Sequence, residues 1–75
     1  MTTQQMQQQI DTRTHGTGQG TVKLRDVRGD VEIEVRVIQP RWIFGRFEIL
    51  VEPIAGAGQW WMEFDGLHPA ATTAA

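Results

Sequence analysis

The segment VEIEVRVIQPRWIF, residues 31–44, decides the fold because its apolar residues change phase halfway along. Up to Val37 the apolar side chains stand at odd positions and alternate with charged ones, which is typical of a strand with one buried face. Beyond Val37 the apolar side chains shift toward even positions. A strand changes phase only at a bulge or a bend, and Pro40 cannot donate a ladder hydrogen bond. The pattern therefore predicts a strand that kinks near Gln39 and Pro40.

Three other segments alternate apolar residues with charged or polar ones: residues 21–25, 46–52 and 60–65. No window has the three-to-four spacing of an amphipathic helix. The sequence therefore predicts an all-β fold with four to five short antiparallel strands. A strongly bent sheet of this size that closes on itself is a small SH3-like or OB-like barrel, and the short connections favour the SH3-like form.

The first hairpin has two candidate registers. A loop over residues 28–29 places Lys23 opposite Glu34, so that opposite charges face each other. A turn at residues 29–30 has better local chemistry, but it places Lys23 opposite Arg36. We expect the first register because its facing charges attract.

The chain divides into a small folded domain, residues 20–67, and two loose ends. Residues 1–19 are dominated by Gln, Thr and Gly and hold three sizeable apolar side chains, so we expect a disordered tail. The alternative is a short helix over residues 4–10 that docks on the domain. Residues 68–75 are expected to form a second disordered tail.

The small size of the folded part predicts self-association. A domain of about 48 residues buries little surface and is marginally stable alone. The chain has no cysteine, which excludes disulfides and thiolate metal sites, so we expect a homo-oligomer. The formal net charge of −2 disfavours nucleic acid as a partner. Because no leader peptide or long apolar run is present, we expect a cytoplasmic protein and no membrane contact.

A tight turn at residues 44–45 places Trp42 opposite Phe47 and Arg41 opposite Glu48, and the expected pairing makes one face of the sheet apolar throughout. The predicted core residues on this face are Trp42, Phe47, Ile49, Val51, Trp60, Met62 and Phe64. Adjacent residues of a strand point to opposite faces, so Trp61 faces outward when Trp60 faces inward. We place Trp61 opposite Glu52, with Leu50 and Ile43 on the same outer face.

These outward apolar residues predict a contact surface. Trp61, Leu50 and Ile43 would form its apolar centre and Arg41 and Arg46 its rim, which is the usual composition of an interface hot spot. The leading hypothesis is a binding module that self-associates through this patch. The alternatives are that Trp61 is covered by the N-terminal segment or the 38–45 corner, or that the patch binds another ligand, such as a protein partner.

No catalytic or metal-binding constellation is recognisable, so we expect a non-catalytic protein without a cofactor. His15 and His68 lie in the predicted tails, which disfavours a metal site. The segment HGTGQG, residues 15–20, lacks the preceding strand and following helix of a phosphate-binding loop. The chain contains no Ser or Tyr, which excludes an intrachain serine triad.

A second hypothesis is single-stranded nucleic-acid binding, because small barrels stack bases on exposed aromatic rings beside arginines. The residues available for this role are Trp42, Trp61, Arg36, Arg41 and Arg46. The negative net charge argues against it.

The segment RWIFGRFEILVEPIAGAGQWWMEFDGL, residues 41–67, is similar to small uncharacterised proteins of bacterial plasmids, phages and gene cassettes. This resemblance implies an SH3-like barrel without implying an activity. In size, tail and architecture the chain also resembles type II dihydrofolate reductases, whose tetramers form a catalytic pore. The Val-Gln-Ile-Tyr strand of that family is missing, and residues 31–34 read Val-Glu-Ile-Glu instead. None of the family's functional residues is therefore transferred to this chain.

Overall fold

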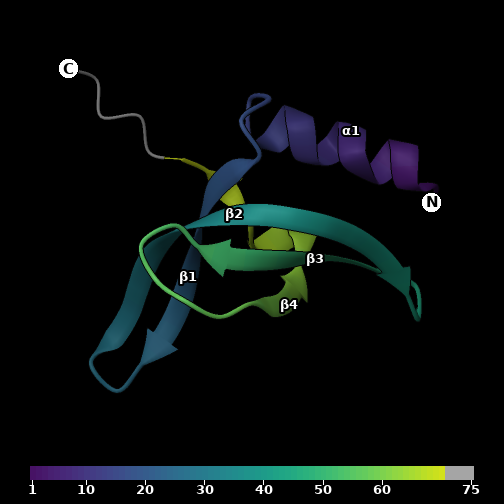
Figure 1. Cartoon of the computed structure of the whole chain (residues 1–75). Coiled ribbons are helices and arrows are strands. Elements are labelled where there is room, and N and C mark those ends of the chain that lie inside the picture. The colour runs from purple at the N-terminus through teal and green to yellow at the C-terminus, as the bar shows by residue number, and fades with distance from the viewer. Residues whose placement is uncertain (71–75) are drawn as a thin grey trace.

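Within the described residues, one α-helix precedes five antiparallel strands that form one open sheet (Figure 1). This computed structural model describes residues 1–70. The elements are α1 (Thr3–Arg13), β1 (Gln19–Asp26), β2 (Gly29–Ile43), β3 (Arg46–Pro53), β4 (Trp60–Glu63), the 3₁₀ helix η1 (Phe64–Gly66) and β5 (His68–Pro69). The strand order in the sheet is β4-β3-β2-β1-β5.

The prediction of a closed SH3-like barrel is wrong. Closure requires the first and last strands of the sheet to pair, but β4 and β5 stand at opposite edges. β5 is only two residues long and pairs with β1 at Gly20 and Thr21 alone. The all-β prediction is also wrong, because residues 3–13 form a helix.

The kink in β2 is confirmed. The register with β3 shifts between Val37 and Gln39, so that Ile38 is an extra residue without a partner in the ladder. This bulge lies directly before Pro40, where the phase change predicted it. β2 is 15 residues long and curves across the whole molecule, pairing with β1 at one end and with β3 at the other (Figure 1).

The N-terminal segment is a docked helix and not a disordered tail, as the alternative interpretation expected. Thr2 and Gln5 form a reciprocal capping box, in which each side chain accepts a hydrogen bond from the other residue's backbone N–H. Gln is also a good helix former. Met6 and Ile10, one turn apart, are both buried. Composition is misleading here because two apolar side chains at this spacing are enough to dock a short helix.

The core lies between α1 and the face of the sheet that we call the inner face. Its buried cluster consists of Ile10, Val22, Val35, Ile49, Val51, Phe64 and Leu67. Three further predicted core residues, Phe47, Trp60 and Met62, are partly buried against this cluster. Trp42 pairs with Phe47 as predicted, but it is 45% exposed because a groove separates it from α1.

The first hairpin adopts a register that neither expectation included. A two-residue turn at residues 27–28 places Lys23 opposite Glu32 and Arg25 opposite Asp30. Opposite charges face each other in this register as well, so the charge criterion does not distinguish it from the expected one.

The strand that follows α1 and the last described strand meet where β5 crosses β1. A Cβ atom added to Gly20 would lie 2.5 Å from the carbonyl oxygen of His68 and 2.7 Å from Cδ1 of Leu67. The crossing therefore requires glycine at this position. Residues 68–69 of the predicted C-terminal tail form β5, and residues 71–75 of that tail lie outside the described part of the chain.

Replacing Ile10 with Ala is expected to lower the free energy of unfolding by about 2–5 kcal/mol, because the side chain is fully enclosed in the core. Gln4→Ala, at an exposed position of the same helix, is the control and is expected to change stability by less than about 0.5 kcal/mol. Urea unfolding followed by circular dichroism measures both variants. Equal stability of the two variants would show that α1 does not dock.

Replacing Gly20 with Ala is expected to cost about 1–3 kcal/mol of stability, since β5 and Leu67 must move away from β1. Gly56→Ala is the matched control, because its added Cβ would lie 3.3 Å from Pro53, which a small shift accommodates. Thermal unfolding of both variants tests the crossing. A Gly20→Ala protein as stable as the control would contradict it.

Candidate interaction surface

The outer face of the sheet, opposite α1, carries the predicted contact residues. Trp61 on β4 lies directly opposite Leu50 on β3, two residues away from the predicted partner Glu52. Trp60 faces the core, so its neighbour Trp61 points outward as expected. Among residues 1–70 no helix or strand covers this face, because α1 packs on the other side.

Arg41 connects three strands across the outer face. Its guanidinium lies over the Trp61 ring, 3.9 Å from the ring centroid. The same side chain donates from Nε to Oε1 of Glu48 at 2.7 Å, and Nη2 lies 2.6 Å from that oxygen. The predicted pairing of Arg41 with Glu48 is therefore confirmed. Together these contacts cover part of the indole, which explains why Trp61 is half-buried although no other element covers it.

Ile43 is separated from the Trp61–Leu50 pair. Ile43 lies at the end of β2, opposite Arg46. The next outward-facing pair along the two strands is the Arg41–Glu48 ion pair, which therefore lies between Ile43 and Leu50. The predicted apolar patch is therefore divided into a Trp61–Leu50 centre and a smaller Ile43 contact near the β2–β3 turn.

Two charges on this surface have no ion-pair partner among the described residues. Glu63 lies directly opposite Glu48, and such a facing pair of like charges is destabilising; Arg41 forms an ion pair with Glu48 but not with Glu63. Arg46 is exposed and forms no ion pair with residues 1–70. The surface thus carries one acid and one base that are free to pair with another molecule.

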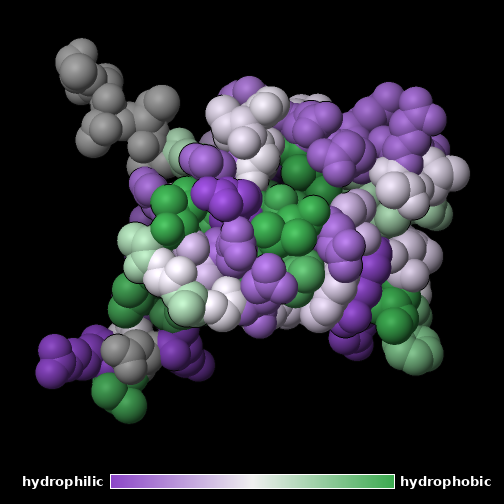
Figure 2. Space-filling view, in the orientation of Figure 1, coloured by the Kyte–Doolittle hydropathy of each residue, from purple (hydrophilic) through white to green (hydrophobic). Residues whose placement is uncertain are grey.

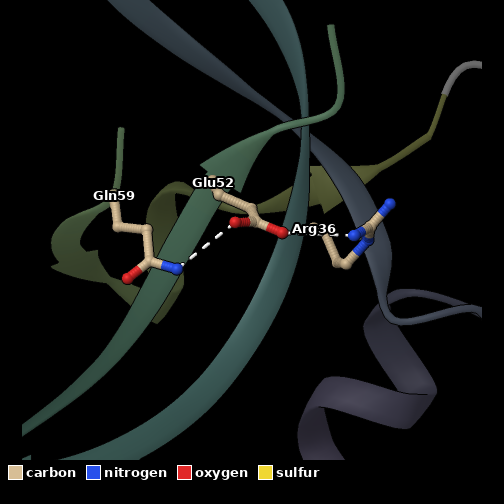
Figure 3. Close-up of polar contacts among 3 residues, drawn as sticks. All are labelled: Arg36, Glu52 and Gln59. Carbon is tan, nitrogen blue, oxygen red and sulfur yellow. Dashed lines mark hydrogen bonds and ion pairs between the residues drawn. The ribbon is translucent and has the colours of Figure 1, made fainter. Parts of the chain in front are cut away.

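A second polar cluster limits the surface on the side away from the β2–β3 turn. Oε1 of Glu52 accepts a hydrogen bond from Nη1 of Arg36 at 3.1 Å, and Oε2 accepts one from Nε2 of Gln59 at 3.2 Å (Figure 3). Glu52 therefore neutralises Arg36 and attaches the loop before β4 to the sheet.

The arginines and tryptophans do not form one base-stacking surface. Trp42 lies on the inner face and Trp61 on the outer face, so a single strand of nucleic acid cannot stack on both. Arg36 and Arg41 are already paired with carboxylates. The geometry gives no support to the nucleic-acid hypothesis, which stays an untested prediction.

The most exposed aromatic ring belongs to Phe44, which the sequence analysis did not single out. Phe44 and Gly45 form the two-residue turn between β2 and β3, with φ values of +51° and +71°. The left-handed conformation is uncommon for a bulky residue, and the ring is 93% exposed. The signal was present in the sequence, because a side chain in a two-residue hairpin turn has no layer above it.

Apolar surface is spread over several places. Figure 2 shows it over β2 and β3 below α1, and again at the ends of the two long hairpins. A hollow of about 750 Å³ lies between the polar face of α1 and the rings of Trp42 and Phe64. Beside it the rings of Phe64 and Phe47 stack with their centroids 4.4 Å apart. The Arg13 guanidinium lies over the Phe64 ring, 4.5 Å from its centroid.

The described residues contain no group of three or more His, Asp or Glu side chains that could hold a metal ion. Within residues 1–70, no helix has both the length and the hydropathy that crossing a bilayer requires. The outer face carries one indole, one aliphatic side chain and a charged rim.

Replacing Arg41 with Lys is expected to lower the free energy of unfolding by about 0.5–1 kcal/mol, because an ammonium cannot stack on Trp61 and bind Glu48 at once. Tryptophan emission is expected to move to longer wavelength as the indole becomes more hydrated. Arg36→Lys, which loses only an exposed ion pair, is the control and is expected to change stability by less than about 0.5 kcal/mol. Identical effects of the two variants would contradict the stacking role.

Comparison of the chain with protein-family models, with curated proteins and with solved structures gives no match. The resemblance to proteins of mobile elements therefore stays a prediction.

Proposed function

We propose that the chain is a small, non-catalytic interaction module that self-associates through the outer face of its sheet. The contact centres on Trp61 and Leu50, with Ile43, Arg41 and Arg46 around them. The observation that carries this proposal is the Trp61–Leu50 pair on a sheet face that no described element covers. The inner face already has α1 as its second layer, whereas a second copy would supply the missing layer on the outer face.

The charges on the outer face support a symmetric contact. In a two-fold interface the same surface of both copies meets, so a charged residue that lies away from the symmetry axis faces a different residue of the other copy. Arg46 and Glu63 are the base and the acid without ion-pair partners among residues 1–70. In the proposed contact, Arg46 of each copy pairs with Glu63 of the other. This pairing also relieves the repulsion between Glu63 and Glu48.

A stable contact buries more area than the Trp61–Leu50 pair provides. A standard interface buries about 800 Å² on each partner, which is roughly a seventh of the 5363 Å² accessible surface of the chain. One tryptophan contributes at most about 250 Å². The Trp61–Leu50 pair therefore needs Ile43, Arg46 and the neighbouring polar residues to complete the contact.

Light scattering after size-exclusion chromatography is expected to give a dimer for the wild type and a monomer for Trp61→Ala. Trp42→Ala is the matched control, since it removes an indole from the inner face and is expected to leave the dimer intact. Circular dichroism verifies that both variants are folded. A monomeric wild type, or a dimer that survives in Trp61→Ala, would contradict the proposal.

A charge exchange tests the symmetry of the contact without removing apolar area. Arg46→Glu and Glu63→Arg are each expected to weaken the dimer by about tenfold, because each replaces an attractive pair by a repulsive one. The double variant restores the pair across the interface and is expected to restore the dimer. Additive weakening in the double variant would exclude this pairing.

A further inference from the structure

The far half of the first hairpin projects from the sheet as a two-stranded ribbon (Figure 1). β5 pairs with β1 only at Gly20 and Thr21, and β3 ends at Pro53, opposite Val35. Beyond these points, β1 residues 23–26 and β2 residues 29–33 have only each other as strand neighbours among the described residues. An isolated two-stranded ribbon is marginally stable in water. The ribbon is therefore the part of the sheet that gains most from an added strand.

The β1 edge of this ribbon is basic on one face and apolar on the other. Lys23 and Arg25 are exposed and form no ion pair within residues 1–70, although they lie across from acidic residues of β2. Between them Leu24 points to the inner face, where it is 40% exposed beside Val31, its partner in the ladder, at 43%. The edge thus offers main-chain hydrogen-bonding groups, two cationic side chains and one uncovered aliphatic side chain.

A second copy of β1 does not fit this edge. In an antiparallel pair, facing residues lie on the same face of the sheet. Every alignment of two β1 strands centred on residues 23–25 places Lys23 or Arg25 opposite another basic residue. Facing like charges are destabilising, and basic residues on an edge strand are a common means of preventing self-pairing. The strand that this edge accepts must carry the opposite charge.

We propose that residues 23–26 of β1 form a binding site for an extended peptide segment in which acidic and apolar residues alternate. The segment adds to the sheet as a sixth strand through main-chain hydrogen bonds. Its acidic residues lie opposite Lys23 and Arg25, and the apolar residue between them covers Leu24. This site is distinct from the outer-face contact around Trp61, and binding here does not depend on self-association.

The chain itself shows that this pattern fits β1. The segment Asp30-Val31-Glu32-Ile33 pairs with the other edge of β1, and it places Asp30 opposite Arg25, Val31 opposite Leu24 and Glu32 opposite Lys23. A partner segment of the same pattern on the open edge would place each basic side chain between two carboxylates and would place Leu24 between two apolar side chains.

The probe is a labelled peptide with the sequence of residues 29–36, GDVEIEVR, acetylated and amidated at its ends. Fluorescence anisotropy at low ionic strength is expected to show saturable binding to the full chain. Two control peptides separate strand pairing from charge attraction: GDEEVVIR, which has the same composition without alternation, and GKVKIKVE, in which every charge is reversed. Both are expected to bind at least about tenfold more weakly, because facing pairs are lost or become repulsive.

Protein variants and hydrogen exchange locate the site. Arg25→Glu is expected to weaken binding of the GDVEIEVR peptide about tenfold. Arg28→Glu, which makes the same charge change in the neighbouring turn, is expected to leave it within about twofold. The peptide is expected to slow amide exchange in residues 23–26 but not in residues 60–63, the open edge of β4. The same binding is expected for Trp61→Ala, whatever its oligomeric state.

Three results would each overturn the proposal. They are equal affinity for the alternating and scrambled peptides, competition by a single-stranded oligonucleotide of equal charge, and slowed exchange at residues 60–63 in place of residues 23–26. The first two would show charge attraction without strand pairing, and the third would place the peptide on the other edge of the sheet.

Discussion

The bulge at Ile38 is the constraint on which the rest of the structure depends. β2 has to pair with β1 in its first half and with β3 in its second half, and both halves have to direct apolar side chains to one core. The sequence changes phase between these halves, so an uninterrupted ladder would turn one of them inside out. The extra residue restores the phase. It keeps Val35 and Trp42 on the inner face and Arg41 on the outer face, where it reaches Glu48 and Trp61.

Alternation predicts the orientation of side chains well, because it depends only on the local geometry of a strand. The bulge, the Trp42–Phe47 and Arg41–Glu48 pairs and the outward direction of Trp61 all follow from it. The register between two strands is harder to predict. A slip of two residues keeps every side chain on its face and, in the first hairpin, keeps opposite charges facing each other. The predicted partners of Lys23 and Trp61 are each wrong by two residues for this reason.

The alternation of apolar and polar residues does not show whether the sheet closes or whether a helix packs on it. Whether a sheet closes depends on the length and twist of its edge strands, and β5 is two residues long. The helix depends on tertiary contacts of Met6 and Ile10, which average composition hides. The stacking of Arg41 on Trp61 joins residues that lie 20 positions apart in the sequence on strands that are not neighbours, so it needs the complete sheet.

The strand order also determines how the molecule is assembled over time. Neighbours β1 to β4 follow one another along the chain, and such local pairings form rapidly because little loop entropy is lost. The exceptions join distant parts of the chain: β5 pairs with β1, and Arg13 donates a hydrogen bond to the carbonyl oxygen of Leu67 at 2.6 Å. Phe64 and Leu67 are the last residues of the buried cluster along the sequence. During synthesis on the ribosome, the meander can therefore begin to form early, while the hydrophobic centre stays incomplete until the final turn has left the exit tunnel.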